Sequence, residues 1–209
     1  MAPLCLEVAP GVAYYPGYLS RARQEALLDA IGAVLAEAPL YRARMPKTGK
    51  PLSVKMSNCG ALGWVSDETG YRYQPNHPET RRPWPPMPRL LMSAWAELAP
   101  HAPPPEACLI NFYDADARMG LHQDRDEREL SAPVVSLSLG DPALFRIGGL
   151  TRNAPTRSLR IESGDALTFG GPARLMFHGV DRIIAGGSTL LPNGGRINLT
   201  LRRVTPAAA

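Results

Sequence analysis

Hydrophobic residues in the first half of the chain recur at helical spacing in two places. The first helix is expected to begin after Ser20, which can cap it, and to end before Pro39. Its apolar face consists of Leu27, Leu28, Ile31, Val34 and Leu35. The spacing predicts a second helix from about Arg89 to Leu98. Its apolar face consists of Leu90, Leu91, Trp95 and Leu98.

Between the two predicted helices lies a long segment punctuated by Gly and Pro, which includes the run QPNHPETRRPWPPMP. This segment also carries Trp64, Tyr71 and Tyr73. An irregular segment of this length inside a compact domain is usually functional or mobile. We therefore expect loops here that are either functional or mobile.

From Ala107 onward the pattern changes to short apolar or alternating runs, each bounded by Gly, Asp, Asn or Pro. These runs are ACLINFY, PVVSLSL, ALFRI, RSLRIE, DALTF, ARLMFHGV and RINLTLRR. Their regular spacing, with no helix between them, predicts an antiparallel barrel or sandwich. We expect a single α+β, mainly β domain over residues 1–209, in which a helix-and-loop half (1–106) covers a double-sheet jelly roll (107–209).

Composition agrees with a globular, turn-rich domain. The chain has 209 residues, 44% of them hydrophobic and 20% charged, with 22 Pro and 19 Gly, which excludes disorder and disfavours a helix bundle.

No apolar run approaches the roughly 20 residues of a membrane-spanning helix, and the N-terminus lacks the pattern of a secretory signal. Three widely spaced cysteines without a CxxC pair argue against disulfides or a zinc ribbon, so a cytoplasmic location is expected.

The formal net charge is +4, and one window concentrates basic residues without any acidic one. This window, residues 41–55, contains Arg42, Arg44, Lys47, Lys50 and Lys55. It is either a phosphate-binding surface or a solvated loop, and the sequence leaves both open.

Two of the four histidines suggest a metal site. His77 and His101 lie in Pro-rich loops and are expected to be ordinary surface residues. His122 and Asp124, at positions i and i+2, point the same way in an extended chain, and His178 ends the apolar run ARLMFHG. Two imidazoles and one carboxylate form the facial triad of non-haem Fe(II) oxygenases, which leaves positions for a 2-oxo acid and O2. A structural zinc site would instead be saturated by four protein ligands.

Two strands carry polar residues that suit a dicarboxylate. In RINLTLRR, alternation places Ile197, Leu199 and Leu201 on one face. The opposite face carries Arg196, Asn198, Thr200 and Arg202. Two inward guanidinium groups could each bind a carboxylate of a 2-oxo diacid, and Asn111 and Tyr113 could hydrogen-bond the same ligand. The alternative is a surface strand with its polar face in water.

Taken together, these motifs resemble the AlkB family of Fe(II)/2-oxoglutarate-dependent dioxygenases, which repair alkylated nucleobases. The similar stretches are SNCGALGW, GYRYQP, RPWPPMP, LINFYDADARMGLHQDRDE, FRIGGLTRNAP, ESGDALTFGGPARLMFHGV and GRINLTLR. The resemblance implies a double-stranded β-helix with an N-terminal nucleotide-recognition lid. It implies that iron is held by His122, Asp124 and His178. It implies that 2-oxoglutarate is held by Asn111, Tyr113, Arg196, Asn198 and Arg202.

The same resemblance assigns the substrate side. Trp64 is expected to stack on the damaged base opposite His122, and Tyr71 and Tyr73 to contact the nucleotide and its phosphate. Asp126 and Arg152 are expected to line the base pocket.

The implied activity is oxidative demethylation of 1-methyladenine and 3-methylcytosine in DNA, single-stranded or with a flipped base, by a monomer. It consumes O2 and 2-oxoglutarate and releases succinate, CO2 and formaldehyde. A related oxygenase that acts on RNA or protein is the first alternative. A jelly-roll binding protein or a zinc hydrolase is the second, but neither explains inward-facing Arg196 and Arg202.

Overall fold

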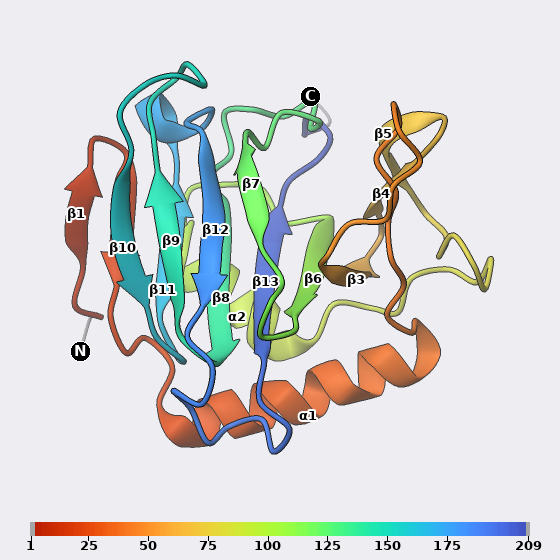
Figure 1. Cartoon of the computed structure of the whole chain (residues 1–209), viewed down its shortest axis with the longest axis horizontal. Helices are drawn as coiled ribbons and strands as arrows, with labels where there is room; N and C mark the ends of the chain where they lie inside the picture. Colours follow the sequence, from red (N-terminus) through yellow and green to blue (C-terminus); the bar gives the residue numbers. More distant parts are fainter. Residues whose placement is uncertain (1–2, 208–209) are drawn as a thin grey trace.

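Two antiparallel sheets and a separate hairpin make up the β structure of the computed structural model, which describes residues 3–207 (Figure 1). The larger sheet has the strand order β1 (Leu6–Ala9), β2 (Val12–Tyr15), β11 (Ala166–Phe169), β8 (Val134–Gly140), β13 (Arg196–Arg202), β6 (Ala107–Tyr113) and β3 (Lys55–Gly60). The smaller sheet has the order β10 (Arg157–Ile161), β9 (Ala143–Ile147), β12 (His178–Ile183) and β7 (Met119–His122). The hairpin pairs β4 (Gly63–Asp67) with β5 (Gly70–Gln74).

Both predicted helices are confirmed, and both pack on the larger sheet. Helix α1 spans Arg21–Glu37, and the Ser20 side chain accepts a hydrogen bond from the backbone N–H of Arg23. Helix α2 spans Arg89–Leu98. Buried residues of both helices join those of β6, β8 and β13 in one hydrophobic cluster. The helices therefore occupy one face of the larger sheet and leave its other face to the smaller sheet.

Strand β13 shows the alternation that its sequence predicts. Ile197, Leu199 and Leu201 are buried in the cluster that contains the helices. The alternate residues Arg196, Asn198, Thr200 and Arg202 line a cavity on the other face. A side-chain period of two along a central strand thus separates the hydrophobic core from the polar site.

The N-terminal half contains strands that the sequence did not predict. Its supposed loops include β3, β4 and β5, and β1 and β2 precede α1. Strands β1, β2 and β3 extend the larger sheet at its two edges, so the two halves of the chain share one sheet. These strands are only four to six residues long, and β3 consists mostly of polar residues and Gly, which explains their weak sequence signal.

The run ARLMFHGV was predicted as one strand, and this was wrong. Gly171–Ala173 form a short 3-10 helix, η1, in which Pro172 lies at an N-terminal position, and β12 begins only at His178. His178 therefore starts a strand instead of ending one.

The expectation that His77 is a surface residue was also wrong, since its side chain is fully buried. Its ring lies between Tyr41 and Trp84, at centroid distances of 5.2 and 5.1 Å. Its Nδ1 accepts from the backbone N–H groups of Glu79 and Thr80, both at 3.1 Å. Its Nε2 donates to the Pro39 carbonyl at 2.8 Å. The Pro-rich loop thus folds around the histidine because each ring nitrogen finds a backbone partner.

The two sheets with helices on one face confirm the predicted mainly β jelly-roll class. No helix within residues 3–207 is long and apolar enough to cross a membrane.

A close approach between β12 and β7 depends on one glycine. A Cβ on Gly179 would lie 2.6 Å from the Met119 carbonyl oxygen and 2.9 Å from that of Gly120. We expect Gly179→Ala to force these strands apart and to cost about 1–3 kcal/mol of unfolding free energy. Denaturant unfolding measures it. Gly120→Ala is the matched control, since its Cβ would meet nothing within 4 Å. Equal stability of the two variants would contradict this account.

Candidate active site

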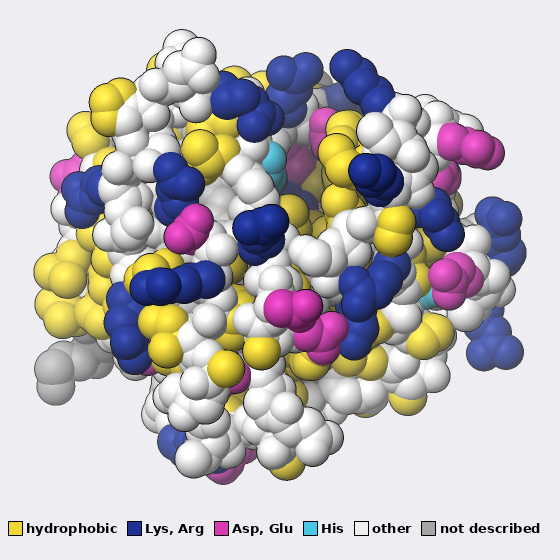
Figure 2. Space-filling view, viewed as in Figure 1, with side chains coloured by type: hydrophobic (Ala, Val, Ile, Leu, Met, Phe, Trp, Pro, Cys, Tyr) yellow, Lys and Arg dark blue, Asp and Glu magenta, His cyan; other side chains and the backbone are white. Residues whose placement is uncertain are grey.

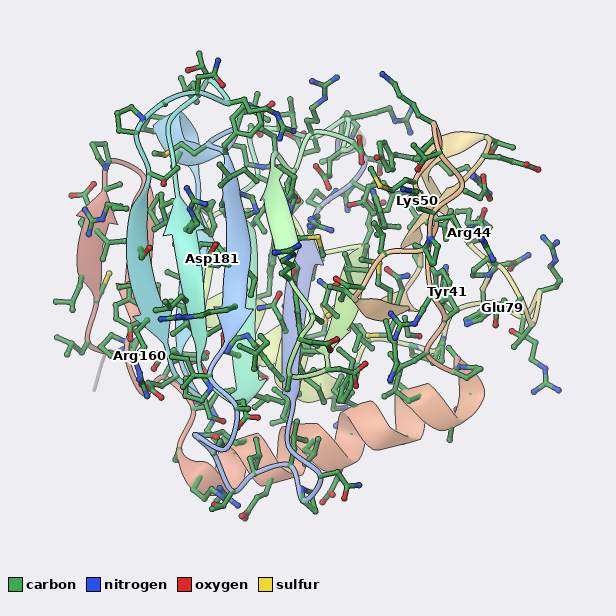
Figure 3. The ribbon with its side chains drawn as sticks, in the orientation of Figure 1. Tyr41, Arg44, Lys50, Glu79, Arg160 and Asp181 are labelled. Carbon is green, nitrogen blue, oxygen red and sulfur yellow. The ribbon has the colours of Figure 1, made fainter. Side chains whose placement is uncertain are left out.

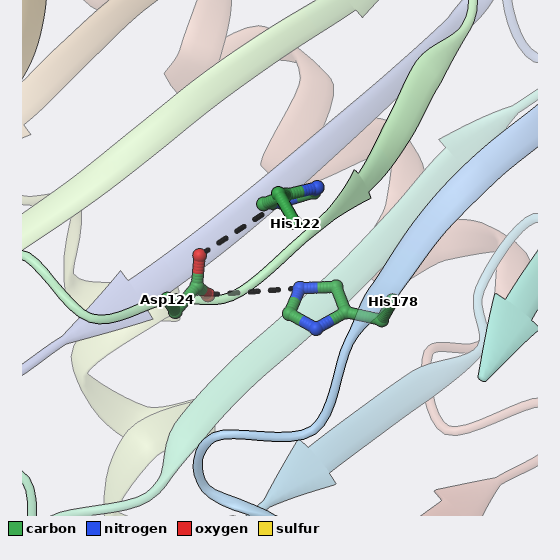
Figure 4. A group of neighbouring side chains, drawn as sticks. All are labelled: His122, Asp124 and His178. Atoms are coloured by element: carbon green, nitrogen blue, oxygen red, sulfur yellow. Dashed lines mark ion pairs between the residues drawn. The ribbon is translucent and has the colours of Figure 1, made fainter. Parts of the chain in front are cut away.

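The two site histidines are direct partners across the β7–β12 pair. His122 ends β7, His178 begins β12, and the two residues are in register. Asp124 follows β7 by two residues and lies 3.9 Å from the Nε2 atom of each histidine (Figure 4). The candidate ligand atoms all lie within 4.8 Å of one another. One divalent cation can therefore contact all three side chains.

Each imidazole ring is oriented by a hydrogen bond to the backbone carbonyl two residues before it. The Nδ1 of His122 lies 2.9 Å from the Gly120 carbonyl oxygen, and the Nδ1 of His178 lies 3.0 Å from that of Met176. Each carbonyl can only accept, so each Nδ1 carries the proton and each Nε2 presents its lone pair. This arrangement fixes the tautomer and the ring orientation that a metal ligand needs.

The electrostatics of the site keep its ligands deprotonated. Burial alone would raise the pKa of Asp124, but Arg202, His178 and His122 together lower it well below its usual range. Arg202 binds this carboxylate with both ends of its fork, Nη2 at 2.8 Å from Oδ1 and Nε at 3.2 Å from Oδ2. Burial, with the neighbouring His122, lowers the pKa of His178 to about 4. Both groups are thus in the metal-binding form at neutral pH.

The triad opens into a cavity of about 530 Å³ between the two sheets. Figure 2 shows a hollow on this face with a histidine visible inside it. Of the residues that the sequence proposed for the site, the structure brings these to the cavity wall: Trp64, Tyr71, Asn111, Tyr113, His122, Asp124, Asp126, Arg152, His178, Arg196, Asn198, Thr200 and Arg202. Tyr73 is the exception. Its hydroxyl donates to Glu127 and lies 3.4 Å from Nη1 of Arg202.

Arg196 is a buried cation without an acidic partner. Its residue is 2% exposed, and no carboxylate in residues 3–207 lies within salt-bridge distance of its guanidinium. Its Nη atoms donate to the Asp141 carbonyl and the Ser138 hydroxyl, whereas its Nε has no partner. Burial lowers its pKa to about 10, so it remains charged at neutral pH. A charged guanidinium that is buried without an acidic partner is unfavourable, so this site is suited to bind an anion.

A second unpartnered atom lies on the neighbouring strand. The buried Oδ1 of Asn111 has no hydrogen-bond partner among the described residues 3–207. Asn198, directly opposite Asn111 in the β13–β6 pair, is oriented by Ser136 and by Thr200, whose hydroxyl donates to it at 2.9 Å. The imidazole and carboxylate ligands fit a divalent cation, and the unpartnered Nε donor of Arg196 fits a carboxylate of a small dicarboxylate that chelates it.

The mouth of the cavity is aromatic. Trp64 is held by Asn58, whose side chain accepts from the Trp64 backbone N–H at 3.0 Å and donates to its carbonyl at 3.1 Å. The indole N–H donates to Asp126 at 2.8 Å, and the indole stacks on Tyr71 with centroids 5.6 Å apart. The half-buried Trp64 thus belongs to the cavity wall and is fixed at its backbone and at its ring.

The basic residues of the window 41–55 fall into two groups, those that form ion pairs and those on an exposed turn. Arg42 and Lys55 both pair with Asp114, at 3.6 and 3.0 Å, and therefore serve local structure. Arg44 and Lys50 lie beside the β4–β5 hairpin (Figure 3). The turn that joins them is exposed and also carries Lys47. Met45, from the same turn, lines the cavity. The turn therefore places free basic charge next to the cavity.

Two buried residues of the site make contacts that the sequence did not predict. Glu127 accepts from Tyr73 and pairs with Arg174 at 3.0 Å and Arg202 at 3.4 Å. Arg174 lies four residues before His178, in a run that the sequence predicted as strand. No spacing rule connects Arg174 to Glu127, because the contact arises only when the two segments fold together.

A jelly roll with two histidines and a carboxylate at its open end defines a non-haem iron oxygenase site. The comparisons agree, since the model of the 2OG-Fe(II) oxygenase superfamily matches residues 11–202. The chain is 55% identical over 202 residues to the alpha-ketoglutarate-dependent dioxygenase AlkB homolog of Caulobacter vibrioides, covering 97% of this chain and 91% of that protein. The chain belongs to the AlkB family of Fe(II)/2-oxoglutarate-dependent dioxygenases.

Two further similarities extend this result. The solved structure of OsALKBH1 superimposes with a TM-score of 0.80 at 30% identity, covering 96% of this chain and all of that one. A DNA N(6)-methyladenine demethylase of Arabidopsis thaliana is 44% identical over 108 residues, which is 47% of this chain and 24% of that protein.

Arg196 offers a test of the anion site. We expect Arg196→Lys to weaken 2-oxoglutarate binding on the order of tenfold or more, because an ammonium cannot meet a carboxylate with a planar fork. Isothermal titration of the Mn(II)-loaded protein measures this affinity. Arg160→Lys is the control, since Arg160 is exposed and pairs with Glu162. An unchanged affinity in Arg196→Lys would remove this residue from the binding site.

Proposed function

We propose that this enzyme removes alkyl groups oxidatively from nucleic-acid bases, with 1-methyladenine and 3-methylcytosine in DNA as its substrates. The observation that carries the proposal is the aromatic Trp64–Tyr71 pair at the mouth of the metal-binding cavity. Membership of the AlkB family supports it, as does the name of the Arabidopsis relative, a DNA demethylase.

Each side chain then has a part in the reaction. We assign Fe(II) to His122, Asp124 and His178. We assign 2-oxoglutarate to Asn111, Tyr113, Arg196, Asn198, Thr200 and Arg202. When bound, these groups supply the oxidising power, so that O2 and 2-oxoglutarate yield succinate and CO2 while the alkyl carbon is hydroxylated and leaves as formaldehyde. The protein orients the ligands and surrounds the reacting carbon with cavity walls.

The base must leave its stack to reach the cavity. Extrusion costs a few kcal/mol, and stacking on one aromatic side chain returns about 1–3 kcal/mol. Trp64 is suited to this stacking because its backbone and its indole N–H are already fixed. Asp126 adds an acidic group near a base that carries positive charge when alkylated. We assign Tyr71 and Arg152 to contacts with the nucleotide, whereas Tyr73 lies outside the cavity lining and its hydroxyl donates to Glu127.

The phosphate backbone has a matching surface. Arg44, Lys47 and Lys50 on the exposed turn lie beside the cavity, and Arg125 and Arg152 line its wall. Such contacts supply sequence-independent affinity that weakens with salt. This charge favours nucleic acid over a protein substrate.

We place the enzyme in the cytoplasm as a monomer that acts on single-stranded DNA or on a flipped base. The three cysteines are widely spaced in the sequence and form no CxxC pair, which supports a reducing compartment.

The proposal is tested by formaldehyde and succinate release from oligonucleotides that carry 1-methyladenine or 3-methylcytosine. DNA, RNA and N-methylated peptide substrates are offered at equal concentration, alone and in competition. We expect equimolar formaldehyde and succinate, with DNA preferred. A preference for RNA or peptide would support the corresponding alternative and overturn the DNA assignment.

Trp64 offers a sharper test of the cavity mouth. We expect Trp64→Ala to weaken binding of a methylated oligonucleotide by about 1–3 kcal/mol, the value of one lost base stack. Binding of metal and 2-oxoglutarate should stay near that of the unmodified protein. Fluorescence anisotropy and calorimetry measure the two affinities.

The matched comparison is Trp84→Ala, because Trp84 is 5% exposed and belongs to the core. We expect this change to cost about 3–5 kcal/mol of stability. If Trp64→Ala loses as much stability as Trp84→Ala, and all binding falls in proportion, Trp64 is a core residue and not a stacking platform.

A further inference from the structure

Arg174 is a buried arginine that lies close behind the metal-ligand triad and does not line the cavity. It follows η1 directly and precedes His178 by four residues. Its side chain is 5% exposed, and each of its three guanidinium nitrogens donates a hydrogen bond. Nε bonds the Ala132 carbonyl at 3.0 Å, Nη1 bonds the Asp124 carbonyl, and Nη2 bonds the Glu127 carboxylate at 3.0 Å.

All three acceptors lie on the segment that carries the ligand Asp124. This segment runs from residue 123 to residue 133, between β7 and β8, and contains no strand or helix. The pairing of β7 with β12 fixes the two histidine ligands relative to each other, whereas Asp124 lies outside this strand pair. A side chain must therefore supply the hydrogen bonds that would otherwise hold this part of the backbone.

Ion pairs also connect these residues. Glu127 has a 1% exposed side chain and is shared between Arg174 and Arg202. Arg202 in turn binds the Asp124 carboxylate. Arg174 also donates a hydrogen bond to the backbone carbonyl of Asp124 itself, which completes a closed network of these four residues. The position of the carboxylate ligand is thus determined from its side chain and from its backbone.

We propose that Arg174 is a positioning residue of the metal centre, which fixes the segment bearing Asp124 against the segment bearing His178. The role follows from the contacts of one planar guanidinium with three separate acceptors. The inference rests on the metal site of this enzyme family and holds whichever alkylated substrate the proposed function assigns.

The test is Arg174→Lys, because lysine keeps the charge but cannot reach three acceptors in one plane. Co(II) is the probe, and its binding is followed by its visible absorption in the absence of substrate and 2-oxoglutarate. Loss of a group that orients a metal ligand typically costs 10–100-fold in metal affinity. We expect Co(II) affinity to fall at least about tenfold and the absorption band to change, because the ligand geometry changes.

Arg203→Lys is the matched control. Arg203 also combines a carboxylate partner, Glu106 at 3.4 Å, with backbone carbonyls, here those of Thr205, Pro104 and Pro206, and none of these is a proposed ligand. Both variants should lower the melting temperature, but only Arg174→Lys should alter Co(II) affinity. Equal Co(II) affinity and an unchanged spectrum in folded Arg174→Lys would overturn the proposal and leave Arg174 a purely structural residue.

If Arg174→Lys does not fold, Arg174→Gln decides the question. Glutamine cannot reach the three acceptors of the guanidinium, and the change leaves the Glu127–Arg202 pair in place. Lower Co(II) affinity supports the positioning role, and unchanged affinity contradicts it. Because the readout is metal binding without substrate, a failure here is distinguishable from a wrong substrate, which would leave Co(II) binding intact and appear only in formaldehyde release.

Discussion

Buried charge must be paired, and this requirement shapes the inner end of the cavity. Asp124 and Glu127 carry two negative charges there, and Arg174 and Arg202 carry two positive ones. The four side chains come from three separate parts of the chain, so the network can form only when both sheets are in place. Breaking one member would leave an uncompensated buried charge, which typically costs several kcal/mol.

Charge balance also explains which ligands suit the site. A divalent cation and a 2-oxo dicarboxylate together add no net charge to a network that is already neutral. Arg196 stands apart from it, since it is buried without an acidic partner and has an unpartnered Nε. A carboxylate at the far end of the cosubstrate would satisfy this guanidinium. The metal site and the anion site are therefore complementary parts of one receptor.

The sequence predicted most of the catalytic half because its signals are local. Strand β13 alternates strictly, so its core face and its cavity face could be separated by the position of each residue. His122 and Asp124 are close in sequence, and His178 was singled out at the end of the run ARLMFHG, although its strand begins there instead of ending. Both helices carry an apolar face of the expected period.

The unpredicted features depend on long-range contacts. Short strands such as β3 and β4 form because neighbouring strands offer hydrogen bonds, which no local pattern reveals. His77 looked like a loop residue, yet the loop closes around it through backbone N–H groups and the distant Pro39 carbonyl. Arg174 meets Glu127 across 47 residues of sequence. Such contacts exist only in the folded chain.

We expect the metal and 2-oxoglutarate to bind as one neutral unit to a preformed receptor. The most direct measurement is the affinity for 2-oxoglutarate with and without Mn(II), by anaerobic calorimetry. The account predicts that Mn(II) tightens 2-oxoglutarate binding by roughly tenfold or more, and that 2-oxoglutarate tightens Mn(II) binding by the same factor. Equal affinity for 2-oxoglutarate in the metal-free and metal-loaded protein would contradict it.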